Sequence, residues 1–110
     1  MTDVAMEKRG TQYEVAVRGH ADYRPGNDIV CAAVSTLTYT LAQVLEDMKE
    51  EGELDCEITL ECGNAGFLIY PRDGEKLETV LQVIRTGFEL LAHRYPLNVR
   101  LECGWEKNAE

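Results

Sequence analysis

The sequence predicts an α+β fold in which two helices cover one face of a five-stranded, largely antiparallel sheet, in the order ββαββαβ. Two periodicities support this prediction. Five short segments alternate apolar and polar residues, as strands with one buried face do, and two longer segments place apolar residues every three or four positions, as amphipathic helices do. Because each strand can bury only one face, both helices are expected on the same side.

The first two strands form a predicted β-hairpin. Apolar residues alternate through Val4 and Met6 and again through residues 13–17, with a Gly-containing turn at residues 9–11. Residues 21–27 hold Pro, Gly and Asn without any period, so we expect an irregular surface loop there.

A first helix is expected from Asp28 to Lys49, because Asp28 is a favourable capping residue and apolar residues then recur at helical spacing. These are Val30, Val34, Leu37, Leu41, Leu45 and Met48. The half from Ile29 to Tyr39 carries no charge on any face, whereas a helix with a solvent face normally carries some. Both sides of this half are therefore expected to be covered.

Two more strands, a helix and a last strand follow. Residues 56–62 alternate in polarity, Gly63 and Asn64 form a turn, and residues 65–70 complete a second hairpin. A second helix is expected over residues 73–96 and a last alternating strand over residues 99–105.

Size and composition fit a single domain over residues 1–110. The chain is 45% hydrophobic and 28% charged, which is ordinary for a globular protein. Neither a signal peptide nor a run of eighteen apolar residues is recognisable, so we expect a cytoplasmic protein with no membrane contact.

The charge of the chain restricts its partners. Eleven Lys and Arg against twenty Asp and Glu give a net charge of −9. Such a surface repels phosphate backbones, which excludes direct nucleic-acid binding, and attracts basic proteins.

All four cysteines are expected to be free thiols, because the cytoplasm is reducing. Cys56, Cys62 and Cys103 match the apolar positions of their strands, and we interpret them as packed core residues. Their spacing lacks the close ligand pairs of a zinc site, so no metal and no cofactor are predicted.

Cys31 and His20 are the candidates for nucleophilic chemistry. Cys31 falls in the first turn of the first helix, where partial positive charge and unpaired N–H groups favour a thiolate and can bind an oxyanion. His20 lies where the second strand ends, and packing of the helix onto the sheet would bring it close to Cys31. Alternation alone puts His20 on the polar face, so a bulge at Gly19 is expected to turn it inward.

Asp28 and Ser35 are candidate supporting residues on the same helix face as Cys31. The carboxylate of Asp28 can orient the imidazole or accept hydrogen bonds from backbone N–H groups. Ser35 can hold the thiol or a bound peptide, although a helical serine most often bonds back to a carbonyl. His93 is interpreted as a solvated residue that suits the C-terminal end of its helix.

A motif in this region resembles the signature of the ribosomal-processing cysteine proteases, the Prp family. It consists of Gly19-His20-Ala21, the loop to Gly26, and Asp28-Ile29-Val30-Cys31-Ala32-Ala33-Val34-Ser35. The resemblance extends roughly from Val4 to Leu101. It implies an endopeptidase in which Cys31 is the nucleophile, His20 is the general base and acid, and Asp28 and Ser35 are supporting residues.

The resemblance also implies a substrate and a partner. Members of the family remove the N-terminal extension of large-subunit ribosomal protein twenty-seven, a basic protein, after an apolar segment that ends in aromatic residues. They are homodimers, and a second copy would cover the charge-free half of the first helix. The loop between His and Cys shapes or gates the peptide site, so its residues are candidates for peptide contact: Asp22, Tyr23, Arg24, Pro25, Gly26 and Asn27.

Two other interpretations stay open. A non-enzymatic, ribosome-associated protein could bind a basic ribosomal protein through its acidic surface, but binding alone gives no reason for His20 and Cys31 at these positions. A redox sensor would need a resolving thiol near Cys31, and the other cysteines are expected in buried strands. The tail 103–110, with Trp105, has no predicted role.

Overall fold

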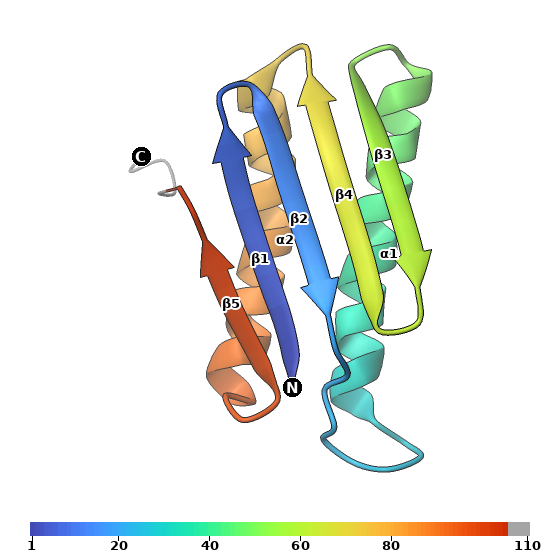
Figure 1. Ribbon diagram of the computed structural model, residues 1–110, viewed down its shortest axis with the longest axis vertical. Coiled ribbons are helices and arrows are strands. Elements are labelled where there is room, and N and C mark those ends of the chain that lie inside the picture. Colours follow the sequence, from blue (N-terminus) through green and yellow to red (C-terminus); the bar gives the residue numbers. More distant parts are fainter. Residues whose placement is uncertain (106–110) are drawn as a thin grey trace.

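Two β-hairpins and a C-terminal strand form one five-stranded sheet in the computed structural model, which describes residues 1–105 (Figure 1). The strands are β1 (Thr2–Arg9), β2 (Gln12–Arg18), β3 (Leu54–Glu61), β4 (Asn64–Pro71) and β5 (Val99–Cys103). They are ordered β3-β4-β2-β1-β5, and only β5 runs parallel to its neighbour β1. The predicted α+β class and the largely antiparallel sheet are confirmed.

The two helices lie side by side on one face of this sheet (Figure 1). Helix α1 spans Ile29–Glu50 and helix α2 spans Gly74–Arg94. Each begins after an aspartate, Asp28 or Asp73, whose carboxylate accepts hydrogen bonds from backbone N–H groups of the first turn. The helix start predicted at Asp28 is therefore confirmed.

The hydrophobic core lies between the helices and the sheet. The side chains that alternate inward from the central strands are buried, among them Met6, Val15 and Phe67, and they pack against the apolar stripes of both helices. Burial of this apolar surface is the main driving force for the fold. Cys56 is buried in this core, as predicted.

Cys62 departs from its prediction as a core residue. It lies in the turn after β3 and is exposed, although it continues the inward alternation of that strand. The loss of cover is gradual, because Cys56 is buried, Ile58 is half-buried and Leu60 is 41% exposed. Alternation fixes the face on which a side chain lies, but a side chain is buried only where another element covers that face.

The charge-free half of α1 is covered on one side only within this chain. Ile29 and Tyr39 are each 60% exposed, while Val30 and Val34 pack against the sheet. Helix α1 is also long and apolar enough to cross a membrane, with a mean hydropathy of 1.4 over 18 residues. One such helix is weak evidence for a membrane segment, because a helix packed into a protein core meets the same criterion.

The last predicted strand ends earlier than its alternation indicates. Strand β5 stops at Cys103, and Trp105 packs its ring edge-on against Tyr13 with the ring centroids 5.5 Å apart. Of the tail 103–110, residues 106–110 lie outside the described part of the chain.

Candidate active site

A cavity of about 350 Å³ lies between the first half of α1 and the turn that joins β3 to β4. The side chains that line it come from four parts of the chain, and they include His20, Cys31, Val34, Ser35, Tyr39, Leu60, Cys62 and Ala65. Three of the four residues singled out from the sequence, His20, Cys31 and Ser35, therefore share one cavity.

Cys31 occupies the first turn of α1 and is half-buried. Its backbone N–H donates a hydrogen bond of 2.8 Å to Oδ1 of Asp28, the capping residue. The helix start thus holds the thiol on the wall of the cavity. It also leaves the N–H of Cys31 already bound, so this group is not available as the oxyanion donor expected at the start of the helix.

Asp28 joins the start of α1 to the preceding loop. Its Oδ2 accepts hydrogen bonds from the backbone N–H groups of Tyr23 at 2.9 Å and Arg24 at 3.3 Å. The pKa of Asp28 lies below its ordinary value. The hydrogen bond from Cys31 is the largest cause, and the bonds from Tyr23 and Arg24 add to it. Asp28 was expected either to orient the imidazole or to accept hydrogen bonds from backbone N–H groups. Both of its carboxylate oxygens accept hydrogen bonds from backbone N–H groups.

His20 reaches the cavity because the chain turns at Gly19. Pairing between β1 and β2 is regular through Asp3 and Arg18, so the ladder contains no bulge, contrary to the prediction. Gly19 instead has φ +88°, a left-handed conformation that favours glycine. A Cβ on Gly19 would lie 2.3 Å from the carbonyl oxygen of Met1, which adds a steric reason for glycine here.

The β3–β4 turn holds the imidazole from the other side. The N–H of Gly19 donates to the carbonyl oxygen of Gly63 at 2.9 Å. The ring of His20 lies so close to Gly63 that a Cβ there would be 2.8 Å from Nε2. The same Nε2 is 4.0 Å from Sγ of Cys62.

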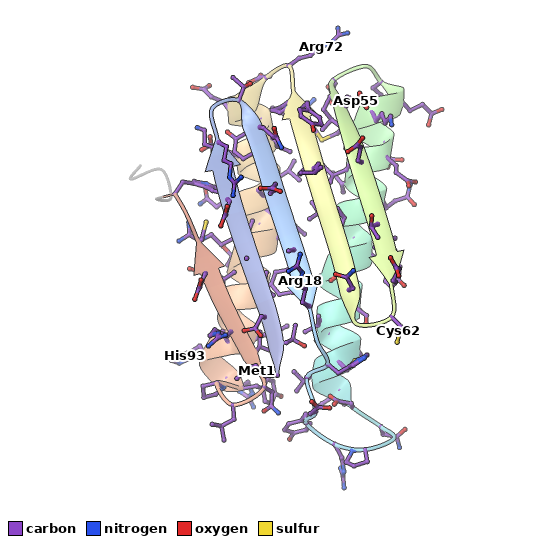
Figure 2. The ribbon with its side chains drawn as sticks, in the orientation of Figure 1. Met1, Arg18, Asp55, Cys62, Arg72 and His93 are labelled. Atoms are coloured by element: carbon purple, nitrogen blue, oxygen red, sulfur yellow. The ribbon has the colours of Figure 1, made fainter. Side chains whose placement is uncertain are left out.

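Cys62 is the site residue that the sequence interpretation missed. Figure 2 shows it at the turn after β3, at the end of the sheet where the β2–α1 loop lies. The sequence contained a signal for this position, because the predicted turn residues Gly63 and Asn64 follow immediately and a residue at a hairpin turn has little cover. In the structure the turn is formed by Cys62 and Gly63, and Asn64 begins β4.

Ser35 lies one helical turn after Cys31, and the hydrogen bonding of its hydroxyl differs from that of the neighbouring threonines. The hydroxyls of Thr36, Thr38 and Thr40 donate to the carbonyl oxygens four residues earlier, at 2.9, 2.8 and 2.6 Å. Within residues 1–105, the hydroxyl of Ser35 makes no hydrogen bond. It is therefore available to a ligand in the cavity.

The loop of residues 21–27 is tied down beside this site. Ala21 is buried, and its carbonyl oxygen accepts a 2.9 Å hydrogen bond from Nδ2 of Asn98. The ring of Tyr23 packs edge-on against Tyr95, with centroids 5.2 Å apart. The loop is therefore anchored on the start of β5 and the end of α2.

The six residues expected to contact peptide do not line the cavity. Residues 22–27 are exposed, and the cavity lining within the described chain passes from His20 directly to Cys31. In this conformation the loop borders the site without contributing side chains to its wall.

One further position, His93, agrees with its sequence interpretation. His93 is exposed in the last turn of α2, beside Arg94. Over residues 1–105, no three His, Cys, Asp or Glu side chains group closely enough to hold a metal ion.

The chain is similar in structure to known proteases. A crystal structure described as an essential ribosomal processing protease Prp from S. aureus, with a covalently linked product peptide, has a TM-score of 0.70 and 23% identity over 94% of this chain and 99% of that chain. The same protease with a substrate peptide has a TM-score of 0.65 at 23% identity, over the same shares of both chains.

A protein from Streptococcus mutans is similar as well, with a TM-score of 0.71 and 26% identity over 96% of this chain and 99% of that chain. Among curated proteins, none matches the sequence. The family model described as cysteine protease Prp matches residues 1–100. That match covers both strands of the first hairpin, the cavity and both helices, and the chain accordingly belongs to the Prp family of cysteine proteases.

Proposed function

We propose that the chain is a cytoplasmic endopeptidase that removes the N-terminal extension of large-subunit ribosomal protein twenty-seven, with Cys31 as nucleophile and His20 as general base and acid. The single observation that carries this proposal is the shared cavity: a thiol at the start of α1 and an imidazole at the end of β2 line one space large enough for peptide side chains.

The reaction follows from these two groups. The thiolate of Cys31 attacks the scissile carbonyl carbon and forms a tetrahedral oxyanion. Its collapse breaks the C–N bond, and the departing amine takes a proton from His20. His20 then accepts a proton from water, which attacks the thioester and releases the new carboxylate and the free thiol.

Ser35 is the proposed oxyanion donor. The N–H of Cys31 is bound to Asp28, so the negative oxygen needs another donor at the cavity. The hydroxyl of Ser35 lines the same cavity without an intramolecular partner among the described residues. Asp28 acts as a positioning residue, since it holds both the first turn of α1 and the adjoining loop.

The substrate class rests on the cavity lining and the charge of the chain. Val34, Leu60 and Ala65 give the cavity apolar walls that suit the apolar segment before the cut. The net charge of −9 attracts a basic ribosomal protein. Support also comes from the related S. aureus protease, whose structures contain a substrate peptide and a product peptide.

The exposed side of α1 supports a homodimer. Ile29 and Tyr39 expose apolar surface on a segment without charge, and a second copy of the chain would remove that surface from water. No nucleic acid, metal or cofactor takes part in the proposed reaction.

The test is cleavage of a peptide that spans the junction of the ribosomal protein's extension. The unmodified chain should cut it once, at a bond located by mass spectrometry. Cys31→Ala and His20→Ala should each lower the turnover number by at least about 10³-fold, because residues that act as a unit fail together. Full turnover by either variant would refute the dyad, and absence of cleavage by the unmodified chain would refute the substrate.

A further inference from the structure

A second thiol faces the catalytic imidazole. Cys62 is exposed at the β3–β4 turn, lines the same cavity as Cys31, and has its Sγ 4.0 Å from Nε2 of His20. A core thiol was expected at this position, and nothing in the peptidase mechanism uses it. Two thiols and one imidazole therefore share one solvent-accessible space.

We propose that Cys31 and Cys62 form a reversible disulfide when a peroxide oxidises the site, with Cys62 as the resolving thiol. The proposal rests on the proposed function for one point only, the nucleophilic character of Cys31. Thiols that respond to oxidants are accessible, reactive and placed near a resolving cysteine. The sequence alone predicted no resolving thiol near Cys31, which disfavoured a redox role. Cys62 is an exposed thiol in the same cavity and can be that resolving thiol.

The chemistry has two balanced steps. The thiolate of Cys31 attacks one oxygen of the peroxide, the O–O bond breaks, and Cys31 becomes a sulfenic acid as the other oxygen leaves as hydroxide and gains a proton. Cys62 then attacks that sulfur while His20 accepts its proton, the S–O bond breaks, and the departing hydroxide takes this proton from His20 and leaves as water. Sulfur is oxidised by two electrons in total and the peroxide is reduced by two. A dithiol reductant reverses the result.

The disulfide would close the cavity. A disulfide requires its two Cα atoms to lie within about 7 Å of each other. Its formation would draw the turn of Cys62 and Gly63 over the first turn of α1, where peptide has to bind, and would consume the nucleophile. Proteolysis would stop until the bond is reduced.

The remaining cysteines do not fit this role. Cys56 is buried on β3, and that burial raises the pKa of its thiol, which disfavours the reactive thiolate. Cys103 lies on β5, at the edge of the sheet opposite β3, and its thiol contacts the carbonyl oxygen of Trp105 at 3.5 Å. Cys103 is therefore the matched control position.

The test oxidises the full chain with hydrogen peroxide and reads the products by mass spectrometry. In the unmodified chain and in Cys103→Ser, we expect loss of two hydrogens and a cross-linked peptide pair containing Cys31 and Cys62, both reversed by a dithiol. In Cys62→Ser we expect no cross-link, and the sulfinic form of Cys31 should accumulate about tenfold faster, because the intramolecular trap is missing. Circular dichroism of each variant verifies that it is folded.

Two results would overturn the proposal: no Cys31–Cys62 cross-link in the unmodified chain, or sulfinic acid at Cys31 forming equally fast with and without Cys62. The oxidised chain is analysed by mass spectrometry without any peptide substrate, so this result is independent of the cleavage test. A chain that cross-links but cuts nothing keeps the disulfide and loses the proposed function, and a chain that cuts but never cross-links does the reverse.

Discussion

The carboxylate of Asp28 accepts a hydrogen bond of 2.8 Å from the backbone N–H of Cys31, so the residue that caps α1 also positions the proposed nucleophile. Its second oxygen binds the backbone of the loop at Tyr23 and Arg24. One side chain therefore couples the first turn of the helix to the segment between His20 and Cys31.

Replacement of Asp28 should separate its capping role from its charge. Asp28→Asn keeps an oxygen that accepts the Cys31 N–H, whereas Asp28→Ala removes it. We expect Asp28→Ala to lower both the midpoint of thermal unfolding, by several degrees, and the turnover number, with Asp28→Asn intermediate. Equal activity of the unmodified chain and Asp28→Ala would show that the cap does not position Cys31.

The contribution of Asp28 to stability should depend on pH. Its folded pKa lies below the ordinary value of 3.8, because backbone N–H groups bind the charged form. Stability from this group is therefore present above the ordinary value and is lost as the pH falls through the lower folded value. The difference in unfolding free energy between the unmodified chain and Asp28→Asn should be constant near neutral pH and shrink as the pH falls below the ordinary value. A difference that grows in acid contradicts this sign.

Gly63 should matter for activity more than for stability. Ala at this position meets a left-handed backbone, φ +70°, and places its Cβ 2.8 Å from Nε2 of His20. Gly10 is the matched control, since its φ is +60° and a Cβ there meets no atom within 4 Å. Both Ala variants should lose about 1–2 kcal/mol of stability, and only Gly63→Ala should lose turnover, by about tenfold or more. Equal turnover in the two variants would show that Gly63 does not position His20.

Ser35→Ala tests the proposed role of Ser35 as oxyanion donor. Loss of a hydrogen bond made mainly in the transition state should lower the turnover number by about 10²-fold with little change in KM. Thr36→Ala is the control, because that exposed hydroxyl donates to a backbone carbonyl of its own helix. A rise in KM with an unchanged turnover number would instead assign Ser35 to peptide binding.

Asn98 anchors the loop from outside the site. Asn98→Ala leaves the carbonyl of the buried Ala21 without the 2.9 Å hydrogen bond from the amide. We expect a loss of about 1–3 kcal/mol in denaturant unfolding and faster hydrogen exchange in residues 21–27. Gln43→Ala, which removes an exposed amide bonded to Asp47, should change stability by less than about 0.5 kcal/mol. A similar small effect for both would show that the loop is held by its other contacts.

Local patterns in the chain were sufficient for the elements and for much of the site. The period of two specified which side chain of each strand turns inward, as for Met6 and Phe67, and the capping aspartate specified where α1 begins. These features depend on neighbours within a few residues, so sequence order alone contains them. Residue type and position likewise singled out Cys31 and His20, which line one cavity, and their catalytic roles stay a prediction.

Packing between distant segments decided the rest. Strand β5 pairs in parallel with β1, and this pairing brings Asn98 to the loop at Ala21. The absence of cover at the end of β3 makes Cys62 a neighbour of His20 rather than a core residue. Strand alternation contains no information about which element lies above a face. Contacts across long stretches of chain decide that, because they set which polar groups and cavities meet.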